Sequence, residues 1–420
     1  MLRLSSLVLA VAALAAFALN PARAAADEDA IAAAIRSADI NTLRGYASAT
    51  QPESRRNLAE GAIAALLNDN VRAEAALGAA IAATDLDNES RARAASTLAG
   101  VLLRQARFAD AVGALSRERD LLGGAFSEPG EARSFALAEV LSSLPVMAAA
   151  VPETGEISLR RDRARLPRAA LTVNGHASEA VLDTGASFST IVESEARELG
   201  VRLLPGAVMI GSAAGATPAR LGVAERLEFA GAQFDNVPFI VLPDEALTFA
   251  GGLYRIKLIL GLPNLMRLGR LEFTFTRDRG VLSYVSAIGE AHAAPNLLLD
   301  GQQPIALVRG NGEELRLLLD TGARSTFLFR VGLGDGSALI VGADQRAARM
   351  VGAGGSSRDA QALRIQSLTL EIGDREVPLE RVNVLGEARG ARQGVLGQDV
   401  LLSGSGYVID FHAMRVELRP

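Results

Sequence analysis

Two segments of the chain end an apolar run with the same four residues: aspartate, threonine, glycine and alanine. They are Asp183–Ala186 and Asp320–Ala323. Average residue usage predicts one aspartate–threonine–glycine segment by chance in roughly one chain in ten of this length. Two such segments, each at the end of an apolar run, are far more specific. Glycine allows a sharp turn there, which aims the aspartate carboxyl group out of the sheet on a rigid backbone.

The rest of the composition leaves carboxyl groups as the main candidates for chemistry. The 420 residues include no cysteine, three histidines and a single lysine, Lys257. A thiol nucleophile and a cysteine-ligated metal are therefore excluded, and isolated histidines support neither a metal site nor a serine–histidine–aspartate triad. We expect no cofactor and no metal. A net charge of −5 argues against nucleic acid as the main partner.

A sequence repeat contains both segments. Three residues recur 137 positions later, so that Pro167, Gly175 and Asp183 correspond to Pro304, Gly312 and Asp320. In each copy an asparagine–glycine pair separates two alternating runs, which is a strong signal for a β-hairpin. The expected strands are Ala169–Val173 and Glu179–Leu182 in the first copy, and Ile305–Val308 and Leu315–Leu319 in the second.

The repeat continues downstream. The matching segments are Leu258–Gly261 with Gly394–Gly397, and Leu271–Phe273 with Ile409–Phe411. Glycine and turn signals become frequent after Pro145, and β-branched or leucine residues alternate with polar ones, which predicts strands. A duplication at this period indicates two similar β lobes, residues 150–288 and 296–420, rather than a solenoid.

From about Leu166 to Pro420 the chain resembles the retropepsin-like aspartic proteases, in particular bacterial periplasmic members with both halves fused in one chain. That family has Asp-Thr-Gly-Ala in each half, and its apolar–apolar–glycine segments pass beneath the active-site loops. The resemblance implies an aspartic endopeptidase that cleaves polypeptides, with two all-β lobes related by a pseudo-two-fold axis. It also implies that Asp183 and Asp320 face each other, hold one water molecule and share one proton.

The resemblance assigns supporting roles to the residues after each aspartate. The threonines would brace the two loops against each other, and the glycines would allow close backbone approach. These residues are Thr184, Gly185 and Ala186 in the first copy, and Thr321, Gly322 and Ala323 in the second. Because alanine, unlike serine or threonine, cannot hydrogen-bond the carboxylate, we expect a pH optimum that is mildly acidic or neutral rather than strongly acidic.

The family also covers its substrate with flaps, and two segments that are apolar and then rich in glycine fit this role. They are Val208–Gly215 and Arg349–Gly355. Such segments suit the mobile tip of a hairpin. An ordinary turn is the alternative for each. The residues expected to contact substrate are Ile210, Gly211, Val351 and Gly352.

Arg324 departs from the family pattern, which has a small polar residue at this position, as Ser187 is in the first copy. The arginine could pair with an acidic residue, read acidic residues of the substrate or mark an inactive site. A catalytically inactive peptide-binding module, recruited by the N-terminal region, is therefore the alternative function. In a third interpretation, the N-terminal region regulates the protein by covering the cleft.

The chain begins like an exported protein. Arg3 gives a positive start, Leu4–Leu19 is apolar and uncharged, and Pro21–Ala24 offers small residues to a signal peptidase. This pattern predicts a signal peptide over residues 1–24 and a periplasmic or secreted mature protein. No later stretch is long and apolar enough to predict a membrane span.

Residues 25–145 are rich in alanine and have helical periodicity. The expected helix pairs are Glu53–Leu67 with Arg72–Ala83 and Glu89–Gln105 with Phe108–Leu122. The second pair resembles a tetratricopeptide repeat, which implies a surface for a protein partner; a generic helical bundle is the alternative. The expected fold class is therefore multidomain α and β: a tetratricopeptide-like helical-hairpin domain, then two all-β retropepsin-like lobes.

Overall fold

A computed structural model describes residues 21–49, 52–212, 215–287, 289, 293–334, 336–352, 355–386 and 392–420. The predicted signal peptide lies outside these residues up to position 20, so it stays a prediction. In the described ranges, no helix has the length and apolar character needed to cross a membrane.

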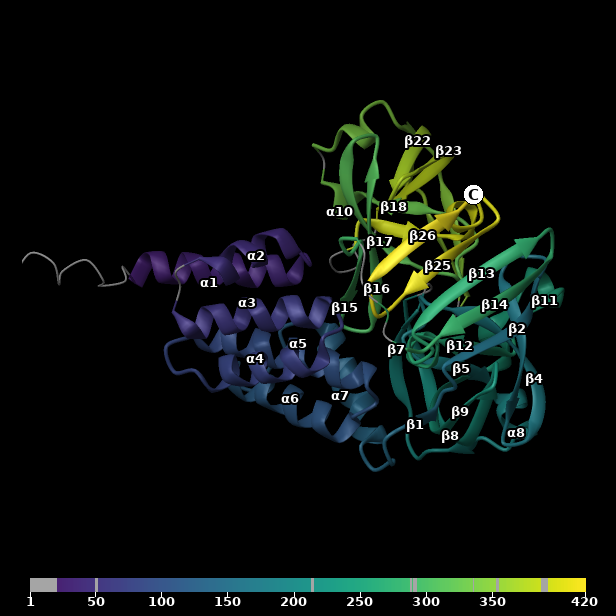
Figure 1. The fold of residues 1–420 in the computed structure, drawn as a ribbon, viewed down its shortest axis with the longest axis horizontal. Coiled ribbons are helices and arrows are strands. Elements are labelled where there is room, and N and C mark those ends of the chain that lie inside the picture. Colours follow the sequence, from purple (N-terminus) through teal and green to yellow (C-terminus); the bar gives the residue numbers. More distant parts are fainter. Residues whose placement is uncertain are drawn as a thin grey trace, which may run out of the picture.

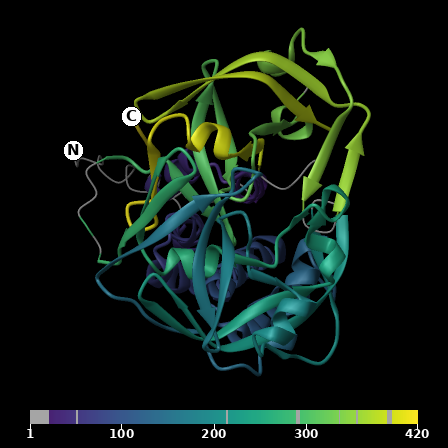
Figure 2. The same ribbon diagram turned by 90° about the vertical axis from the view of Figure 1, so that its right-hand side faces the viewer.

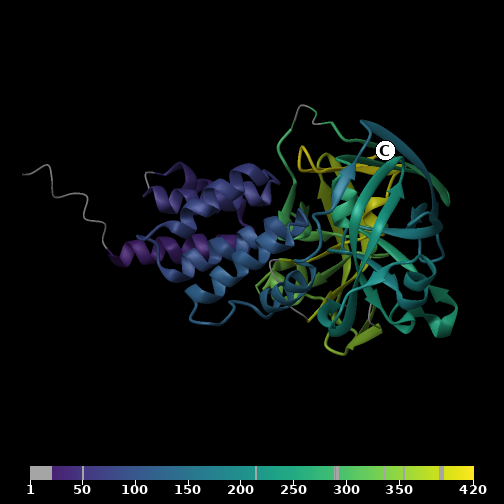
Figure 3. The same cartoon turned by 90° about the horizontal axis from the view of Figure 1, so that it is seen from below.

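The N-terminal region is helical, and its helices lie to one side of the β-rich part of the molecule (Figures 1 and 3). Its helices are α1 (Pro21–Arg36), α2 (Ile40–Ser48), α3 (Glu53–Leu66), α4 (Asn70–Ala82), α5 (Asn88–Arg104), α6 (Phe108–Leu121) and α7 (Pro129–Leu141). The helices predicted from residue 53 to residue 122 are confirmed within one or two residues. Aspartate side chains cap α2, α4 and α5 by accepting backbone N–H groups.

The first β lobe contains a closed ring of six strands. In ring order they are β3 (Pro167–Val173), β4 (His176–Asp183), β12 (Leu258–Gly261), β5 (Ser189–Val192), β9 (Ala232–Leu242) and β8 (Gly215–Phe229). The ring closes because β8 also pairs with β3, where Thr172 lies opposite Glu228. Closure leaves no free edge within the ring.

The second lobe repeats this order. Its ring contains β16 (Gln303–Gly310), β17 (Glu313–Leu319), β24 (Gly394–Leu396), β18 (Phe327–Phe329), β23 (Arg375–Leu385) and β22 (Leu363–Ile372). Arg309 lies opposite Glu371 where β22 returns to β16. The expectation of a helical region followed by two β lobes is therefore confirmed.

Both predicted hairpins turn on an asparagine–glycine pair with left-handed backbone. Asn174 and Gly175 have φ of 50° and 81°, and Asn311 and Gly312 have φ of 46° and 90°. These values suit a two-residue turn that matches the twist of its strands. The turns fix the register of β4 and β17, and with it the position of the aspartate at or just after each strand end.

A C-terminal hairpin joins the two lobes. Its strands, β25 (Gly406–Asp410) and β26 (Arg415–Arg419), continue the sheet of the first lobe through β13 (Arg270–Thr276), β14 (Arg279–Val285) and β2 (Thr154–Arg161). In this sheet Leu271 lies directly opposite Ile409. The repeated segments Leu271–Phe273 and Ile409–Phe411 are thus neighbours, and the two sequence repeats share one sheet.

The remaining elements are short, or lie at the edges of the lobes. The strands are β1 (Ala148–Ala150), β6 (Arg202–Leu203), β7 (Val208–Ser212), β10 (Thr248–Phe249), β11 (Tyr254–Arg255), β15 (Leu297–Asp300), β19 (Asp344–Gln345), β20 (Ala348–Gly352) and β21 (Gly355–Asp359). The helices are α8 (Glu193–Glu198), α9 (Leu262–Met266), α10 (Arg330–Leu333) and α11 (Gln398–Leu401), with 3₁₀ turns η1 (Asp244–Leu247), η2 (Ala250–Gly252) and η3 (Ala338–Ile340).

The helical region packs on both lobes. Buried residues of α5 to α7 belong to the same apolar core as the first lobe, and Phe108 stacks on Phe188 with ring centroids 6.2 Å apart. Residues of α3, including Leu58 and Leu66, share a second core with Leu298 and Ile305 of the second lobe. The helical region is therefore docked across both lobes rather than tethered beside them.

Candidate active site

The two aspartates lie where equivalent strands end. Asp183 is the last residue of β4, which runs parallel to β12 so that Asp183 lies opposite Gly261. Asp320 follows β17, and its backbone N–H donates to the carbonyl of Leu396 on β24 over 3.1 Å. A buried parallel pair of strands in each lobe thus holds each aspartate backbone.

The carboxyl groups of Asp183 and Asp320 meet and hydrogen-bond each other. Asp183 Oδ1 also accepts the backbone N–H groups of Gly185, over 2.8 Å, and Ala186, over 3.1 Å. Asp320 Oδ1 accepts the N–H of Gly322 over 2.8 Å. These bonds hold one oxygen of each carboxyl group and fix the orientation of the other.

The two buried threonines cross-link the motifs. Thr184 Oγ1 donates to the carbonyl of Leu319 over 2.6 Å and accepts the N–H of Thr321 over 3.1 Å. Reciprocally, Thr321 Oγ1 donates to the carbonyl of Leu182 over 2.8 Å and accepts the N–H of Thr184 over 3.0 Å. Both hydroxyl groups thus donate and accept across the lobe interface, which locks the two loops in one relative position.

The motif glycines leave the space that the opposite carboxyl group fills. A Cβ on Gly185 would lie 2.5 Å from Cγ of Asp320, and a Cβ on Gly322 would lie 2.3 Å from Cγ of Asp183. No side chain fits at these distances. The two glycines are therefore a condition for the carboxyl groups to meet.

The paired apolar–apolar–glycine segments pass directly beneath the motif loops. A Cβ on Gly261 would lie 2.6 Å from the carbonyl carbon of Phe188, and one on Gly397 would lie 2.7 Å from that of Ser325. The residue after each glycine donates its N–H to the carbonyl oxygen of the motif alanine. Leu262 donates to Ala186 and Gln398 donates to Ala323, both over 2.9 Å.

Two hydroxyl residues that the sequence analysis did not single out support this arrangement. Ser189 Oγ accepts the N–H of Gly261 over 3.1 Å, and Thr326 Oγ1 accepts the N–H of Gly397 over 3.0 Å. Ser189 in turn donates to Asn264, and Thr326 donates to Asp399. Extending the 137-residue repeat by six positions beyond each aspartate would have identified the hydroxyl pair.

The surroundings of the two aspartates change their acidity. Burial, the negative charge of Asp183 and the hydrogen bond to it raise the pKa of Asp320 well above the ordinary value. Burial also raises the pKa of Asp183, although the hydrogen bond from Asp320 and the N–H groups of Gly185 and Ala186 oppose the increase. The pair therefore binds a proton at a pH where an isolated aspartate is ionised.

The pair lies in a cleft of about 1790 Å³ between the lobes. Of the four expected flap residues, Ile210, Gly211 and Gly352 line this cleft. They belong to the hairpins β7–β8 and β20–β21, in which Ile210 lies opposite Thr217 and Val351 opposite Ser356. The tip residues 213, 214, 353 and 354 lie outside the described part. Figure 2 shows the two hairpins, teal and yellow-green, on the same side of the molecule.

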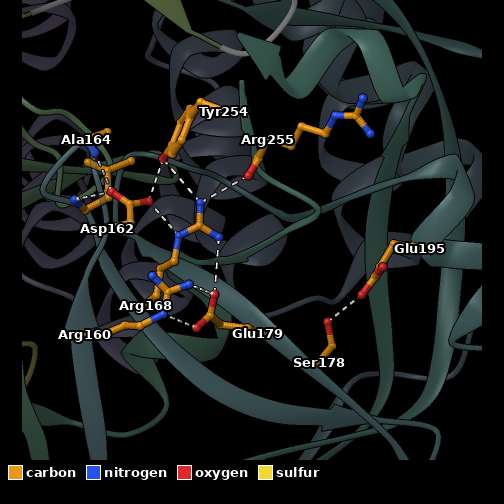
Figure 4. Close-up of polar contacts among 10 residues, drawn as sticks. Arg160, Asp162, Ala164, Arg168, Ser178, Glu179, Glu195, Tyr254 and Arg255 are labelled. Atoms are coloured by element: carbon orange, nitrogen blue, oxygen red, sulfur yellow. Dashed lines mark hydrogen bonds and ion pairs between the residues drawn. The ribbon is translucent and has the colours of Figure 1, made fainter. Parts of the chain in front are cut away.

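One wall of the cleft is fixed by a buried polar network in the first lobe (Figure 4). Asp162 Oδ2 accepts hydrogen bonds from Tyr254 Oη and Arg168 Nε, both over 2.6 Å. Its Oδ1 accepts the N–H groups of Ala164 and Leu166. Ala164, Leu166 and Tyr254 all line the cleft, so Asp162 holds two segments of the wall together.

The network also changes the acidity of its members. Burial and the hydrogen bond to Asp162 raise the pKa of Tyr254 to about 12. Although burial acts in the opposite direction, the hydrogen bonds from Tyr254 and Arg168 hold the pKa of Asp162 below its ordinary value. Tyr254 is therefore neutral at neutral pH, where Asp162 and Arg168 form an ion pair.

The helical region forms a further wall of the cleft. Residues from the end of α1, from α3, from α5 and from the first turns of α7 line the same cleft as the two aspartates. The turn after β15 supports this contact, because a Cβ on Gly100 would lie 3.0 Å from Cα of Gly301. A sequence pattern shows which helix faces are apolar but not which surface they meet.

The comparisons with known proteins bear on the first lobe. Residues 169–263 match the family model described as Aspartyl protease. This match covers Asp183, the first motif and the segment that ends in Gly261. No curated protein is significantly similar to the chain in sequence.

One similar solved structure is a retropepsin-like aspartic protease from Rickettsia conorii, with 23% sequence identity and a TM-score of 0.23. The similarity covers 32% of this chain and 95% of that one.

Proposed function

We propose that the chain is an aspartic endopeptidase in which Asp183 and Asp320 activate a water molecule against a peptide bond. The observation that carries the proposal is the hydrogen-bonded carboxyl pair, with raised pKa values, lining a large cleft. The cleft volume of about 1790 Å³ exceeds the roughly 300–1,000 Å³ of small-molecule sites, which favours a polypeptide substrate.

The proposed reaction starts with one proton on the pair. The ionised carboxylate of Asp183 takes a proton from the water, whose oxygen bonds to the carbonyl carbon of the substrate. The protonated Asp320 gives its proton to the carbonyl oxygen, which yields a tetrahedral diol. The C–N bond then breaks as Asp183 returns its proton to the nitrogen, and a hydroxyl proton of the diol restores Asp320.

The unequal pKa shifts support this division of roles. The pKa of Asp320 is raised by burial and by the charge of Asp183, whereas the hydrogen bond from Asp320 favours the ionised form of Asp183. The resting proton is therefore assigned to Asp320. The two groups titrate as a coupled pair, so both kinetic pKa values belong to the pair.

A pseudo-two-fold relation of the lobes is part of the same proposal. Its support is the reciprocal set of hydrogen bonds between Thr184 and Thr321, together with the matched strand order of the two rings. Such an arrangement gives each lobe one carboxyl group and one flap. Neither lobe would then hydrolyse a peptide alone.

Arg324 is the feature that would favour an inactive peptide-binding module instead. Its side chain is exposed, lines the cleft and forms no ion pair with a described residue. It therefore leaves both carboxyl groups of the pair unoccupied. This observation favours the hydrolytic function over the alternative.

The test compares the full chain with Asp183→Asn and Asp320→Asn on an unfolded protein substrate, with product formation followed by mass spectrometry. We expect each variant to lose about 10²–10⁴-fold in kcat, because each removes one partner of the acid–base pair. Asp374→Asn is the matched control, since this aspartate is exposed in the turn between β22 and β23. Equal cleavage by all four proteins would remove the proposal, and peptide binding without cleavage by the wild type would favour the inactive module.

A further inference from the structure

The cleft is rich in arginine. Among the described residues, six arginines and no lysine line it. Four of them, Arg36, Arg93, Arg104 and Arg133, come from the helical region. The guanidinium group binds a carboxylate through two parallel hydrogen bonds, which the lysine ammonium group does not offer.

Three of these arginines have no acidic partner. Within the described ranges, Arg36, Arg133 and Arg324 form no ion pair and no side-chain hydrogen bond, although all three line the cleft. Arg36 and Arg324 are exposed, and Arg133 is half-buried. Their charges are therefore available to a group that enters the cleft.

Arg104 is a fourth positive charge without a carboxylate. Its side chain is only 5% exposed and hydrogen-bonds neutral oxygens alone: Asn70 Oδ1 over 2.8 Å, the carbonyl of Ala65 over 2.9 Å and the carbonyl of Gly301 over 3.4 Å. Burial without a counter-ion lowers the pKa of Arg104 to about 10. A buried charge of this kind is costly to the fold, and a nearby negative charge would reduce the cost.

Beside the carboxyl pair, three described acidic residues line the cleft: Glu128, which is exposed, Glu131 and Asp300. Glu131 is bound by Arg93, by Ser96 and by the N–H of Glu128 at the start of α7. Burial raises the pKa of Asp300, which favours its uncharged form. Six arginines thus stand against five acidic residues in the described part of the cleft lining, in a chain whose net charge is −5.

From this contrast, we propose that the helical region forms an accessory binding site for an acidic segment of the polypeptide substrate, with Arg36 and Arg133 as its carboxylate-binding side chains. This inference rests on the proposed peptidase function. An extended peptide advances about 3.3 Å per residue, so residues several positions from the cleaved bond would reach the helices. The helical region then selects substrates instead of only covering the cleft.

The exposed arginine charges also predict how strongly the accessory site binds and how it responds to salt. Each exposed arginine–carboxylate pair contributes modestly, so single neutralisations at Arg36 or Arg133 should weaken binding about two- to fivefold. Salt should reduce the preference, because exposed charges are screened. The catalytic step should be unaffected, since neither residue contacts the carboxyl pair.

The experiment uses the full chain carrying Asp183→Asn, which binds without cleaving. Three fluorescent peptides share one apolar core of six residues and carry three glutamates, three glutamines or three lysines at one end, with a second series carrying them at the other end. Affinity is measured by fluorescence anisotropy at low and high salt. The variants are Arg36→Glu, Arg133→Glu and their combination. Arg117→Glu is the control, because Arg117 is exposed on α6 outside the cleft.

We expect the glutamate peptide to bind at least tenfold more tightly than the lysine peptide, and the double variant to remove or reverse the preference while Arg117→Glu keeps it. The same substitutions in the active chain should raise KM for the glutamate peptide without changing kcat. Equal affinities of the three peptides, or equal effects of the double variant and Arg117→Glu, would overturn the accessory site. Binding preference without hydrolysis by the active chain would instead count against the peptidase function and leave the accessory site standing.

Discussion

Asp183 and Asp320 occupy equivalent positions in their motifs but have different surroundings. Asp183 accepts two backbone N–H groups, from Gly185 over 2.8 Å and from Ala186 over 3.1 Å. Burial raises the pKa of both groups, and at Asp320 the charge of Asp183 adds to the effect. The N–H groups of Gly322 and Ala323 likewise bind Asp320 and oppose the increase. The two carboxyl groups therefore titrate as one coupled pair.

The raised pKa of Asp320 has a consequence for stability. An aspartate whose pKa is higher in the folded state than in the unfolded state binds more protons when folded, so stability falls as pH rises from the unfolded value of 3.8 towards the folded value. Asparagine at this position cannot titrate. We therefore expect Asp320→Asn to become increasingly stable relative to the wild type over this range, by up to about 1.4 kcal/mol per pH unit.

Urea unfolding of both proteins between pH 4 and pH 7 measures this difference. Asp374→Asn serves as the control, because it removes one carboxyl group from an exposed turn far from the buried pair in sequence. A difference between Asp320→Asn and wild type that does not grow with pH would show that Asp320 is already ionised in the folded protein.

The element that supports the carboxyl pair most closely is the segment ending in Gly261. A Cβ there would lie 2.6 Å from the backbone of Phe188, which follows the first motif. Gly261→Ala should therefore displace the motif loop, with a loss of about 1–3 kcal/mol in stability and a marked fall in kcat. Gly113→Ala on α6 is the matched control, because its added Cβ meets no atom within 4 Å and it does not line the cleft.

Denaturant unfolding measures the stability of both alanine variants, and peptide hydrolysis measures their kcat. Wild-type kcat in Gly261→Ala would show that the loop yields without moving the carboxyl groups. An equal loss of kcat in Gly113→Ala would show instead that the effect does not come from the segment beneath the motif.

The elements differ in how far the sequence predicts them. Local signals define the helices from residue 53 to residue 122 and both asparagine–glycine hairpins, because alanine periodicity, aspartate caps and left-handed turn residues act over a few positions. Partners are harder to predict. The pattern of Ile409–Phe411 indicates a strand, but nothing local indicates that it pairs with Leu271 of the other repeat.

The same limit applies to the site. The repeat identified both aspartates, both threonines and both glycines, because each is tied to a motif. The accessory arginines Arg36 and Arg133 belong to no motif, and only the docking of the helices on the lobes brings them into the cleft.

The docking of the helical region is the property of the whole molecule that links stability to the site. Phe108 is 3% exposed and stacks on Phe188, which itself lines the cleft and lies five residues from Asp183. Replacing Phe108 removes packing on both sides of this interface. By contrast, Phe126 packs against Phe135 within the helical region, with the ring planes tilted by 45°.

We therefore expect Phe108→Ala to lower stability by about 3–5 kcal/mol and also to raise KM, because Phe188 and the arginines of the helical wall lose their position. Phe126→Ala should destabilise the protein without changing KM. Urea unfolding followed by circular dichroism measures the stability of both variants. Peptide hydrolysis, assayed at a urea concentration where every variant is folded, measures KM separately. If the helices melted first in wild type and hydrolysis of acidic peptides continued unchanged, the helical region would be dispensable for substrate binding. A single transition with coupled loss of affinity would instead make the helices and both lobes one functional unit.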